Sequence, residues 1–492
     1  MITINKAILN TDYYKNTIAR QFVEYIEKNI NGIEDATLYY GYPVVRELDE
    51  EMISADITIV SPNHGLLIFK CDALTKIRDN EDDILNYQIS RLEDIIFSRL
   101  IKSPHKNLKA GKRQLSFNFE TCLYLPYLSK DISHDSFEST VIVDNSGIIK
   151  FFSERSNKKL DNEVITAIFS ILDATTGIIR PKERIIPKDD ICSKAYLLKK
   201  LEEEIALFDE QQKYAALSQL NGPQRIRGLA GSGKTIILCI KAAFLHLKYP
   251  DKKILYTFMT RSLYDYIQVL ITRFYKLLGD GNLPDFEESI HIRHAWGGHN
   301  LPGVYFDTCL ENSVEPINFN KAKLNSDRND VFDYVCNQLI IERNGKLKKE
   351  YDYVLIDEGQ DFKPRFYQIC RAIVNDDCLV WAYDELQNIF NINLQDTVNT
   401  FKNEFGAQGI NLAELQKNHP EIENDIVLSK CYRNPLEILV TAHSIGFGIY
   451  SDQLIQSLEN NAHWQDLGYE VLSGNCQDGD EMVIKRPPKN SP

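Results

Sequence analysis

The chain has 492 residues, of which 43% are hydrophobic and 26% are charged; this is an ordinary globular composition, but the chain is too long for one compact core, so roughly two to four domains are expected. The formal net charge of −14 excludes a surface that coats nucleic acid or anionic membrane indiscriminately, although a local basic channel is compatible with it. The sequence has no run of about eighteen apolar residues and no basic segment leading into an apolar core at its start, so we expect a cytoplasmic protein without a membrane span or secretory signal.

The first third of the chain alternates between helical and strand-like patterns. Apolar residues recur at helical spacing over 18–30 and over 84–100. Between these predicted helices lie strand-like runs and one tight turn, at 37–42, 55–60, 61–65 and 66–71. A helix, a hairpin and a helix in this order resemble the core of the PD-(D/E)xK nuclease fold and, in detail, the nuclease-related (NERD) domain of bacterial proteins.

This resemblance implies a set of nuclease-like residues. In that family an acid at the end of one strand and an E-x-K sequence on the next strand hold a divalent metal and orient a water. Here Asp56 matches the acid, Lys70 the lysine and Gln88 a glutamine on the helix, whereas Ile68 occupies the position of the glutamate. One carboxylate alone is a poor site for Mg²⁺, which prefers several oxygen ligands in near-octahedral geometry.

Two acids of the first predicted helix, Glu24 and Glu27, are candidates for a further oxygen ligand. Because the glutamate itself is replaced, we expect a degenerate domain that binds or serves as a scaffold, with DNA cleavage as the alternative hypothesis.

A basic segment follows, with Lys102, His105, Lys106, Lys109, Lys112 and Arg113. We expect a loop here, and the sequence leaves open whether it contacts phosphate or is only solvated. Strands are predicted at 115–127 and 139–149 and a helix at 164–172. Prolines between 181 and 187 then interrupt the pattern, so we place the first domain at 1–190.

The most informative stretch of the chain is Gly228-Leu-Ala-Gly231-Ser232-Gly233-Lys234-Thr235. It follows a short strand-like run and opens an apolar helical pattern at 236–247. The glycines of G-x-x-x-x-G-K-T let the backbone approach phosphate closely, and the loop directs successive N–H groups and a helix N-terminus toward it. The pattern predicts that Lys234 reaches the β- and γ-phosphates and that Thr235 binds Mg²⁺.

A helical segment is predicted at 191–220, directly before this loop. A glutamine here could recognise the adenine edge, because its amide both donates and accepts hydrogen bonds. We choose Gln212 for this role, with Gln211 as the alternative.

An apolar strand at 353–356 ends in the acids Asp357 and Glu358. A buried strand that delivers two acids to the carboxyl edge of a parallel sheet places the first on Mg²⁺ and the second beside the γ-phosphate, as base or water-orienting group. Two later pieces fit the same site. Gln387, after a strand at 378–383, is expected to sense the γ-phosphate, and the forked guanidinium of Arg433 suits the charge that develops on it.

Together these residues, with Asp357-Glu-Gly-Gln-Asp361 as the most specific string, resemble the first motor lobe of superfamily 1 DNA helicases of the UvrD/Rep type over roughly residues 205 to 440. The resemblance implies an α/β protein in which a restriction-endonuclease-like domain precedes a P-loop, RecA-like domain with a parallel sheet. It also implies hydrolysis of ATP with Mg²⁺, coupled to single-stranded or partly duplex DNA, in DNA processing or defence against foreign DNA.

The resemblance further indicates residues that would contact a nucleic acid strand. Thr257 and Phe258 match the end of a strand with this role, and Trp296 or His294 lies where the family has another strand-contacting motif. Phe390 keeps an aromatic residue after the third motif, but the tryptophan and arginine that accompany it in the family are absent.

The second motor lobe is missing or only begun, since 59 residues follow Arg433. We therefore expect the motor lobe at 191–450 and the start of a second lobe or a tail at 451–492. A motor moves by opening and closing a cleft between two lobes, so the missing lobe would come from a downstream segment or from a protein partner. The alternatives are a DNA endonuclease gated by ATP and a nucleotide-dependent subunit that recruits a partner without unwinding.

Overall fold

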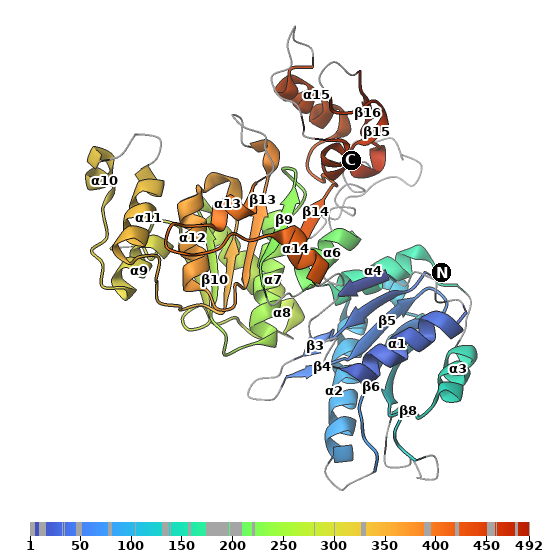
Figure 1. The fold of residues 1–492 in the computed structure, drawn as a ribbon. Helices are drawn as coiled ribbons and strands as arrows, with labels where there is room; N and C mark the ends of the chain where they lie inside the picture. The colour runs from blue at the N-terminus through green and yellow to red at the C-terminus, as the bar shows by residue number, and fades with distance from the viewer. Residues whose placement is uncertain are drawn as a thin grey trace. The chain divides into compact units, whose positions relative to one another are not determined.

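The computed structural model describes most of the chain (Figure 1). The described residues are 5–8, 16–31, 33, 35–45, 52–76, 81–103, 105–129, 137, 139–155, 159–173, 196, 209–218, 222–279, 281–299, 301–325, 331–387, 395–418, 423–449, 458, 460–477 and 481–491. By its internal contacts the chain divides into two compact units. The first comprises residues 1–219 and 273–283, and the second comprises 220–272 and 284–492.

The first unit is built on a mixed six-stranded sheet with the order β1-β2-β5-β6-β7-β8. The β2–β5 and β5–β6 pairs are antiparallel, and the other three pairs are parallel. Its elements are β1 (Asn5–Ile8), α1 (Thr17–Asn29), β2 (Thr37–Tyr40), β3 (Val44–Val45), β4 (Ile53–Ser54), β5 (Ile57–Ser61), β6 (Gly65–Cys71), α2 (Glu81–Lys102), η2 (Lys106–Leu108), β7 (Phe119–Tyr124), β8 (Thr140–Ile142), α3 (Asn145–Glu154), α4 (Asn162–Leu172) and α6 (Glu210–Leu217).

Alternating side chains of this sheet supply two cores. Leu67 and Phe69 of β6 pack with Phe22 of α1 and Phe152 of α3, and a second cluster joins Ile89 of α2 to β7. The period of two along the strands therefore places α1 and α3 against one set of side chains and α2 against another. The helix, hairpin and helix expected from the sequence are present as α1, β5–β6 and α2.

The strand expected at 139–149 is wrong in its second half. β8 ends at Ile142, and α3 begins at Asn145. Asp144 causes the change, because its carboxylate accepts a hydrogen bond of 2.7 Å from Gly147 N and so caps the helix. Of the apolar residues that suggested a strand, Ile148 lies on the buried face of α3 with Phe151 and Phe152, whereas Ile149 is exposed.

The second unit is built on a six-stranded, all-parallel sheet with the order β11-β10-β12-β13-β9-β14 (Figure 1). The protein is thus an α/β protein in which a mixed sheet precedes a parallel one. The elements of this unit are β9 (Gln224–Gly228), α7 (Lys234–Lys248), β10 (Ile254–Phe258), η4 (Arg261–Leu263), α8 (Tyr264–Leu278, whose last residues count with the first unit), β11 (Ile290–His294), α9 (Val304–Glu311), α10 (Phe319–Asn325), α11 (Val331–Glu342), β12 (Tyr353–Ile356), η5 (Gly359–Asp361), α12 (Pro364–Ile373), β13 (Leu379–Tyr383), η6 (Glu385–Gln387), α13 (Thr397–Phe401), α14 (Leu412–Asn418), β14 (Asp425–Leu428), α15 (Leu436–Phe447), α16 (Asn461–Asp466), β15 (Glu470–Ser473), β16 (Val483–Lys485) and η7 (Pro488–Asn490).

Strands β10, β12 and β13 are buried along their whole length and read as nearly continuous apolar runs, as expected for a parallel sheet covered on both faces. After β14 the chain forms the helix α15 and, further on, the strand β15. In the described part of the chain, no helix combines the length and the apolar character needed to cross a membrane.

Candidate functional site

The candidate site of the second unit lies at the carboxyl edge of the parallel sheet. β9 ends at Gly228, β12 ends directly before Asp357, and β13, which pairs with both strands, ends directly before Asp384. The connection from β9 to β10 crosses β13 and β12 in one direction along the sheet. The connection from β13 to β14 crosses β9 in the opposite direction. Such a change in the direction of the connections is the place where parallel α/β sheets bind ligands.

The phosphate loop has the backbone that its glycines allow. Gly231 and Gly233 have φ angles of +86° and +94°, and Gly233 is the N-cap residue of α7. A side chain is costly in this region of φ and ψ. Gly228 is also a close approach, because a Cβ there would lie 2.6 Å from Ser232 Oγ and 2.9 Å from Leu428 Cβ. The loop is therefore a short, glycine-dependent connection between the end of β9 and the N-terminus of α7.

Lys234 is buried and points back into this loop. Its Nζ donates to Gly228 O at 2.8 Å and to Leu229 O at 3.1 Å. It also pairs with Asp384 Oδ2 at 3.3 Å, and the two side chains are only 6% and 1% exposed. The ammonium thus lies inside the curve of the loop, where its third partner is a carboxylate at the end of the neighbouring strand.

Asp357 and Thr235, the two residues expected to bind Mg²⁺, are in direct contact. The Thr235 hydroxyl hydrogen-bonds to the Asp357 carboxylate, whose Oδ2 also accepts from Tyr256 Oη at 3.0 Å. Burial, followed by the charge of Glu358, raises the pKa of Asp357 to about 6, and these two hydrogen bonds oppose the rise. A completely buried carboxylate with a raised pKa favours a bound cation, because the cation would supply the opposite charge that the site lacks.

Glu358 is linked to the end of β13 by Gln360. Gln360 Nε2 donates to Glu358 Oε2 at 2.7 Å, while Gln360 Oε1 accepts from the backbone N of Asp384 at 3.1 Å. Glu358 itself has left-handed backbone angles, with φ 50° and ψ 51°, which is uncommon for a residue with a side chain. One glutamine therefore connects the acid after β12 to the acid that pairs with Lys234.

Arg433 lies against the phosphate loop. Tyr432 N donates to Gly231 O at 3.0 Å, and a Cβ at Gly231 would lie 2.5 Å from Arg433 Cβ. Arg433 is exposed, and in the described part of the chain its guanidinium has no hydrogen bond or ion pair. The segment after β14 thus brings a free arginine to the loop from a distant part of the sequence.

The remaining predicted nucleotide-site residues are less completely described. Gln387 is the last residue of η6, but its side chain lies outside the described set. Gln212 lies on α6 in the first unit, is buried, and its Oε1 accepts from Asp209 N at 3.1 Å in a capping box. Recognition of an adenine edge by that oxygen would compete with this cap. Gln211, the alternative, is exposed.

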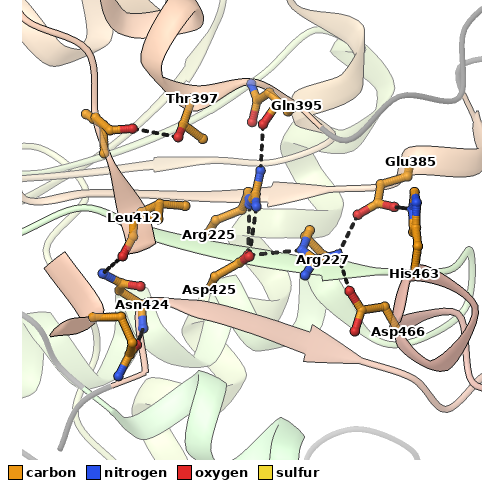
Figure 2. Close-up of polar contacts among 12 residues, drawn as sticks. Arg225, Arg227, Glu385, Gln395, Thr397, Leu412, Asn424, Asp425, His463 and Asp466 are labelled. Carbon is orange, nitrogen blue, oxygen red and sulfur yellow. Dashed lines mark hydrogen bonds and ion pairs between the residues drawn. The ribbon is translucent and has the colours of Figure 1, made fainter. Parts of the chain in front are cut away.

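A buried charge network under the loop was not expected from the sequence (Figure 2). Arg227 donates through Nη1 to Glu385 and to Asp466, both at 2.8 Å, and through Nε to Asp425 at 3.0 Å. Arg225 forms a bidentate pair with Asp425, with both distances 2.8 Å. The sequence did contain one sign of this network. Two arginines at alternate positions of a central strand lie on the same face and need buried acids as partners.

His463 extends the network to α16, because its Nε2 hydrogen-bonds to Glu385 (Figure 2). Burial alone would raise the pKa of Glu385, but the contacts of His463 and Arg227 outweigh it and hold that pKa below its ordinary value. Leu229 and Cys431 also belong to an apolar cluster with Trp464 and Tyr469. The last described part of the chain therefore packs directly beneath the phosphate loop.

The residues expected to contact nucleic acid are largely packed into the protein. Thr257 and Phe258 are completely buried in β10, so contact through these side chains needs a change in structure. Trp296 packs against Tyr305, Phe319 and Phe332 with ring centroids 5.2 to 6.3 Å apart.

The two other residues predicted to contact nucleic acid have different outcomes. His294 is held by Met259 O at 2.7 Å and by two backbone N–H groups. Phe390 lies outside the described residues.

The nuclease-like residues of the first unit form a smaller constellation. Asp56 accepts hydrogen bonds from Cys71 N at 2.8 Å and from Asn16 at 3.3 Å, and Lys70 Nζ lies 3.6 Å from its Oδ2. Lys70 also donates to Ser54 O at 3.1 Å. The carboxylate is thus satisfied by the protein itself.

The other nuclease-like positions supply no acid to this pair. Ile68 is completely buried, and Gln88 is half-buried on α2. Glu24 is exposed on α1 and faces Arg20 at 4.0 Å. In the described part of the chain, no three His, Cys, Asp or Glu side chains gather as a metal site.

Comparison of the sequence with models of known protein families and with curated proteins found no match. The function of the chain therefore has to follow from the arrangement of its own residues.

Proposed function

We propose that the second unit binds ATP with Mg²⁺ at the carboxyl edge of its parallel sheet and hydrolyses it, as a RecA-like motor lobe of the UvrD/Rep helicase type. The observation that carries this proposal is the contact between Thr235 and Asp357, beside a glycine loop that curves around Lys234. Thr235 lies at the start of α7 and Asp357 directly after β12, more than a hundred positions later, and an ordinary glycine turn gives no reason for them to meet.

The residues present fit the groups that the proposal requires. Mg²⁺ in nucleotide sites is usually bound by one or two carboxylates and by the phosphates of the substrate, so Asp357 with Thr235 suffices on the protein side. When bound, Mg²⁺ would neutralise charge on the phosphates. Lys234 and the N–H groups from Gly231 to Thr235 would hold the phosphates, with Lys234 exchanging the Asp384 carboxylate for a phosphate oxygen.

The remaining roles follow from the same geometry. Glu358 would orient the attacking water and accept its proton, and Gln360 would hold that carboxylate in place. Arg433 has its backbone and Cβ against Gly231, and its guanidinium, which has no hydrogen bond or ion pair in the described part of the chain, would stabilise charge on the transferred phosphoryl group. Gln387 stays a candidate sensor of the γ-phosphate.

For the first unit, we propose a degenerate nuclease-like domain that binds DNA. The support is that Asp56, the acid of the motif, already accepts two hydrogen bonds and pairs with Lys70, while Ile68 replaces the second acid. A buried isoleucine offers no oxygen to a metal. ATP-gated cleavage remains the alternative, and DNA processing or defence against foreign DNA is the setting that we propose for either activity.

The test is the rate of ATP hydrolysis by the full chain, with and without single-stranded DNA. In Glu358→Gln we expect the rate to fall by a factor of about 10² to 10⁴, the usual contribution of general base catalysis, while ATP binding is retained. An unchanged rate would remove Glu358 from the site. ATP binding without hydrolysis by the parent would instead favour a recruiting subunit, and a second motor lobe supplied in trans would then be sought as an activator.

A further inference from the structure

The ATPase proposed above makes no use of the basic segment of the first unit, and the DNA binding proposed for that unit has so far been given no site. From residue 102 to 119 the chain contains Lys102, Lys106, Lys109, Lys112 and Arg113 and no aspartate or glutamate, although acids outnumber Lys and Arg by 70 to 56 in the whole chain. Such a stretch in an acidic protein concentrates positive potential on one segment.

The cations of this segment are uncommitted. Lys106, Lys112 and Arg113 are exposed, and in the described part of the chain none of them has a hydrogen bond or an ion pair. Lys109 is different, since its Nζ donates to Ser103 O at 2.8 Å. Three charges are therefore available for an anionic partner without breaking an existing interaction.

The same segment lines a cavity of about 650 Å³. Arg113 and Gln114 come from its tip, Phe117 and Asn118 from the stretch that leads into β7, and Phe97 from α2. Ser116 ties this wall to η2, because its N donates to Leu108 O at 2.9 Å. The volume is that of a cleft able to take an organic ligand the size of a nucleotide or more.

The walls combine aromatic rings with the amide of Gln114. Phe97 and Phe119 stack on each other, with ring centroids 6.3 Å apart and an interplanar angle of 23°. Phe117 is only half-buried and has no ring partner in the described part of the chain, and the Gln114 side chain is exposed and has no hydrogen bond there. An uncovered ring next to an amide and an arginine is suited to stack a base and to contact its edge and phosphate.

Two acids also line the cavity, but they do not cancel the positive charge of the basic segment. Glu120 pairs with Arg155 at 2.6 Å, so its charge is neutralised locally. Glu93 accepts a hydrogen bond from the Thr121 hydroxyl and leaves one negative charge. The three exposed cations, Lys106, Lys112 and Arg113, outnumber this one negative charge.

The cavity is separate from the nuclease-like pair. Gly65, which lines it, pairs with Ser61 at the turn of the β5–β6 hairpin, whereas Asp56 and Lys70 lie at the open end. The two ends are five residues apart along each strand, which is about 16 Å at roughly 3.3 Å per residue. A ligand in the cavity would not be held by the nuclease-like residues.

We propose that this cavity and its basic rim form a binding groove for single-stranded nucleic acid, in which Phe117 stacks a base while Lys106, Lys112 and Arg113 contact the backbone. A duplex hides the base faces that Phe117 would stack, and a free mononucleotide would engage few of the cations. The groove goes beyond the proposed ATPase and does not depend on it.

The test is binding of a fluorescein-labelled oligothymidylate of about 16 nucleotides to the full chain without ATP, followed by anisotropy at several salt concentrations. For Lys106→Ala/Lys112→Ala/Arg113→Ala we expect at least a tenfold loss of affinity, and a salt slope smaller by about 2, because each single-strand phosphate contact contributes about 0.7. For Phe117→Ala we expect a loss of about 5-fold to 100-fold with an unchanged slope.

The matched control removes the same charge elsewhere. Arg343, Lys346 and Lys349 are exposed in the second unit and have no ion pair in the described part of the chain, so their triple alanine variant should bind like the parent. Equal losses in both triple variants, or none in either, would overturn the proposal. The proposal would also be overturned if duplex DNA bound as tightly as the single strand and Phe117→Ala left that binding unchanged. Complete displacement of the oligonucleotide by thymidine monophosphate would overturn it too.

A second measurement locates the strand. We expect photo-crosslinking with an iodouracil oligonucleotide, followed by mass spectrometry, to give crosslinked peptides that cover 109–120. Crosslinks confined to the second unit would contradict the groove even if anisotropy shows binding.

Discussion

Both units place an acid and a lysine together at the end of a strand, but the two sites differ in how many chain segments reach them. In the parallel sheet, β9, β12 and β13 all end at the same edge, so Lys234 meets Asp384 and Thr235 meets Asp357 although they are distant in sequence. In the mixed sheet, β5 and β6 are antiparallel, so the start of one strand meets the end of the other and only Asp56 and Lys70 are brought together. Parallel strands gather functional groups at one edge, whereas a hairpin brings few.

The two sites also differ in burial. The Lys234–Asp384 pair is 6% and 1% exposed, whereas the Lys70–Asp56 pair is 15% and 21% exposed. Charges withdrawn from water interact strongly and are costly to leave unpaired, while charges near the surface are screened. Matched substitutions in the two units should therefore have very different effects.

The largest difference is expected from removing a buried cation. Arg227→Met leaves Glu385, Asp425 and Asp466 without their shared guanidinium and should reduce the free energy of unfolding by about 3–5 kcal/mol. Lys70→Met in the first unit should cost at most about 1 kcal/mol. Hydrogen exchange of peptides that cover β9 and β6 measures the two effects separately, and similar losses in both would contradict the contrast in burial.

A smaller effect, on binding, is expected from Gly231→Ala. The new Cβ would lie 2.5 Å from Arg433 Cβ at a φ of +86°, so the loop must move, and we expect ATP affinity to fall at least about 100-fold, or roughly 3 kcal/mol. Gly406 has a similar φ of +98° with open space around it. Gly406→Ala should therefore carry the backbone cost of about 1 kcal/mol and leave ATP affinity unchanged. Equal ATP affinities in the two variants would show that the contact with Arg433 is irrelevant to binding.

The buried carboxylate of Asp357 should make stability depend on pH by about 1–3 kcal/mol. Burial raises the pKa of Asp357 to about 6, above its unfolded value of about 4. The stabilisation that comes from the protonated form is complete below about pH 4 and is lost as pH rises through about 6.

Without Mg²⁺ we therefore expect Asp357→Asn to be more stable than the parent at pH 7 by about 1–3 kcal/mol, although it should no longer respond to Mg²⁺ with ATP. Melting curves between pH 4 and 8 check this. Parallel curves for parent and variant would show that the buried carboxylate carries no such penalty.

The smallest effect is expected from Asp56→Asn. The amide oxygen can still accept from Cys71 N, so the stability of the first unit should change by less than about 1 kcal/mol. Plasmid incubated with Mg²⁺ or Mn²⁺ should stay equally intact with parent and variant. Cutting by the parent that disappears in Asp56→Asn would instead establish a nuclease.

The sequence was most informative where a residue type has one physical use. The glycines of the phosphate loop, the acids after an apolar strand and the periodic helices were all predictable, because each of these patterns is specific to one local geometry. The network of Arg225, Arg227 and Glu385 was missed, since nothing local shows which strand will lie next to β9. Asp144 was misread for a related reason: a capping residue ended a strand that apolar periodicity alone would have continued.

The most direct test of the nucleotide site is a calorimetric titration of the full chain with ATP and Mg²⁺. The account predicts one ATP per chain, an affinity at least about 100-fold lower in Lys234→Ala, and an unchanged affinity in Lys252→Ala, whose ammonium is exposed and pairs with Asp352 before β12. ATP binding of equal strength in Lys234→Ala, or no binding by the parent, would contradict the account.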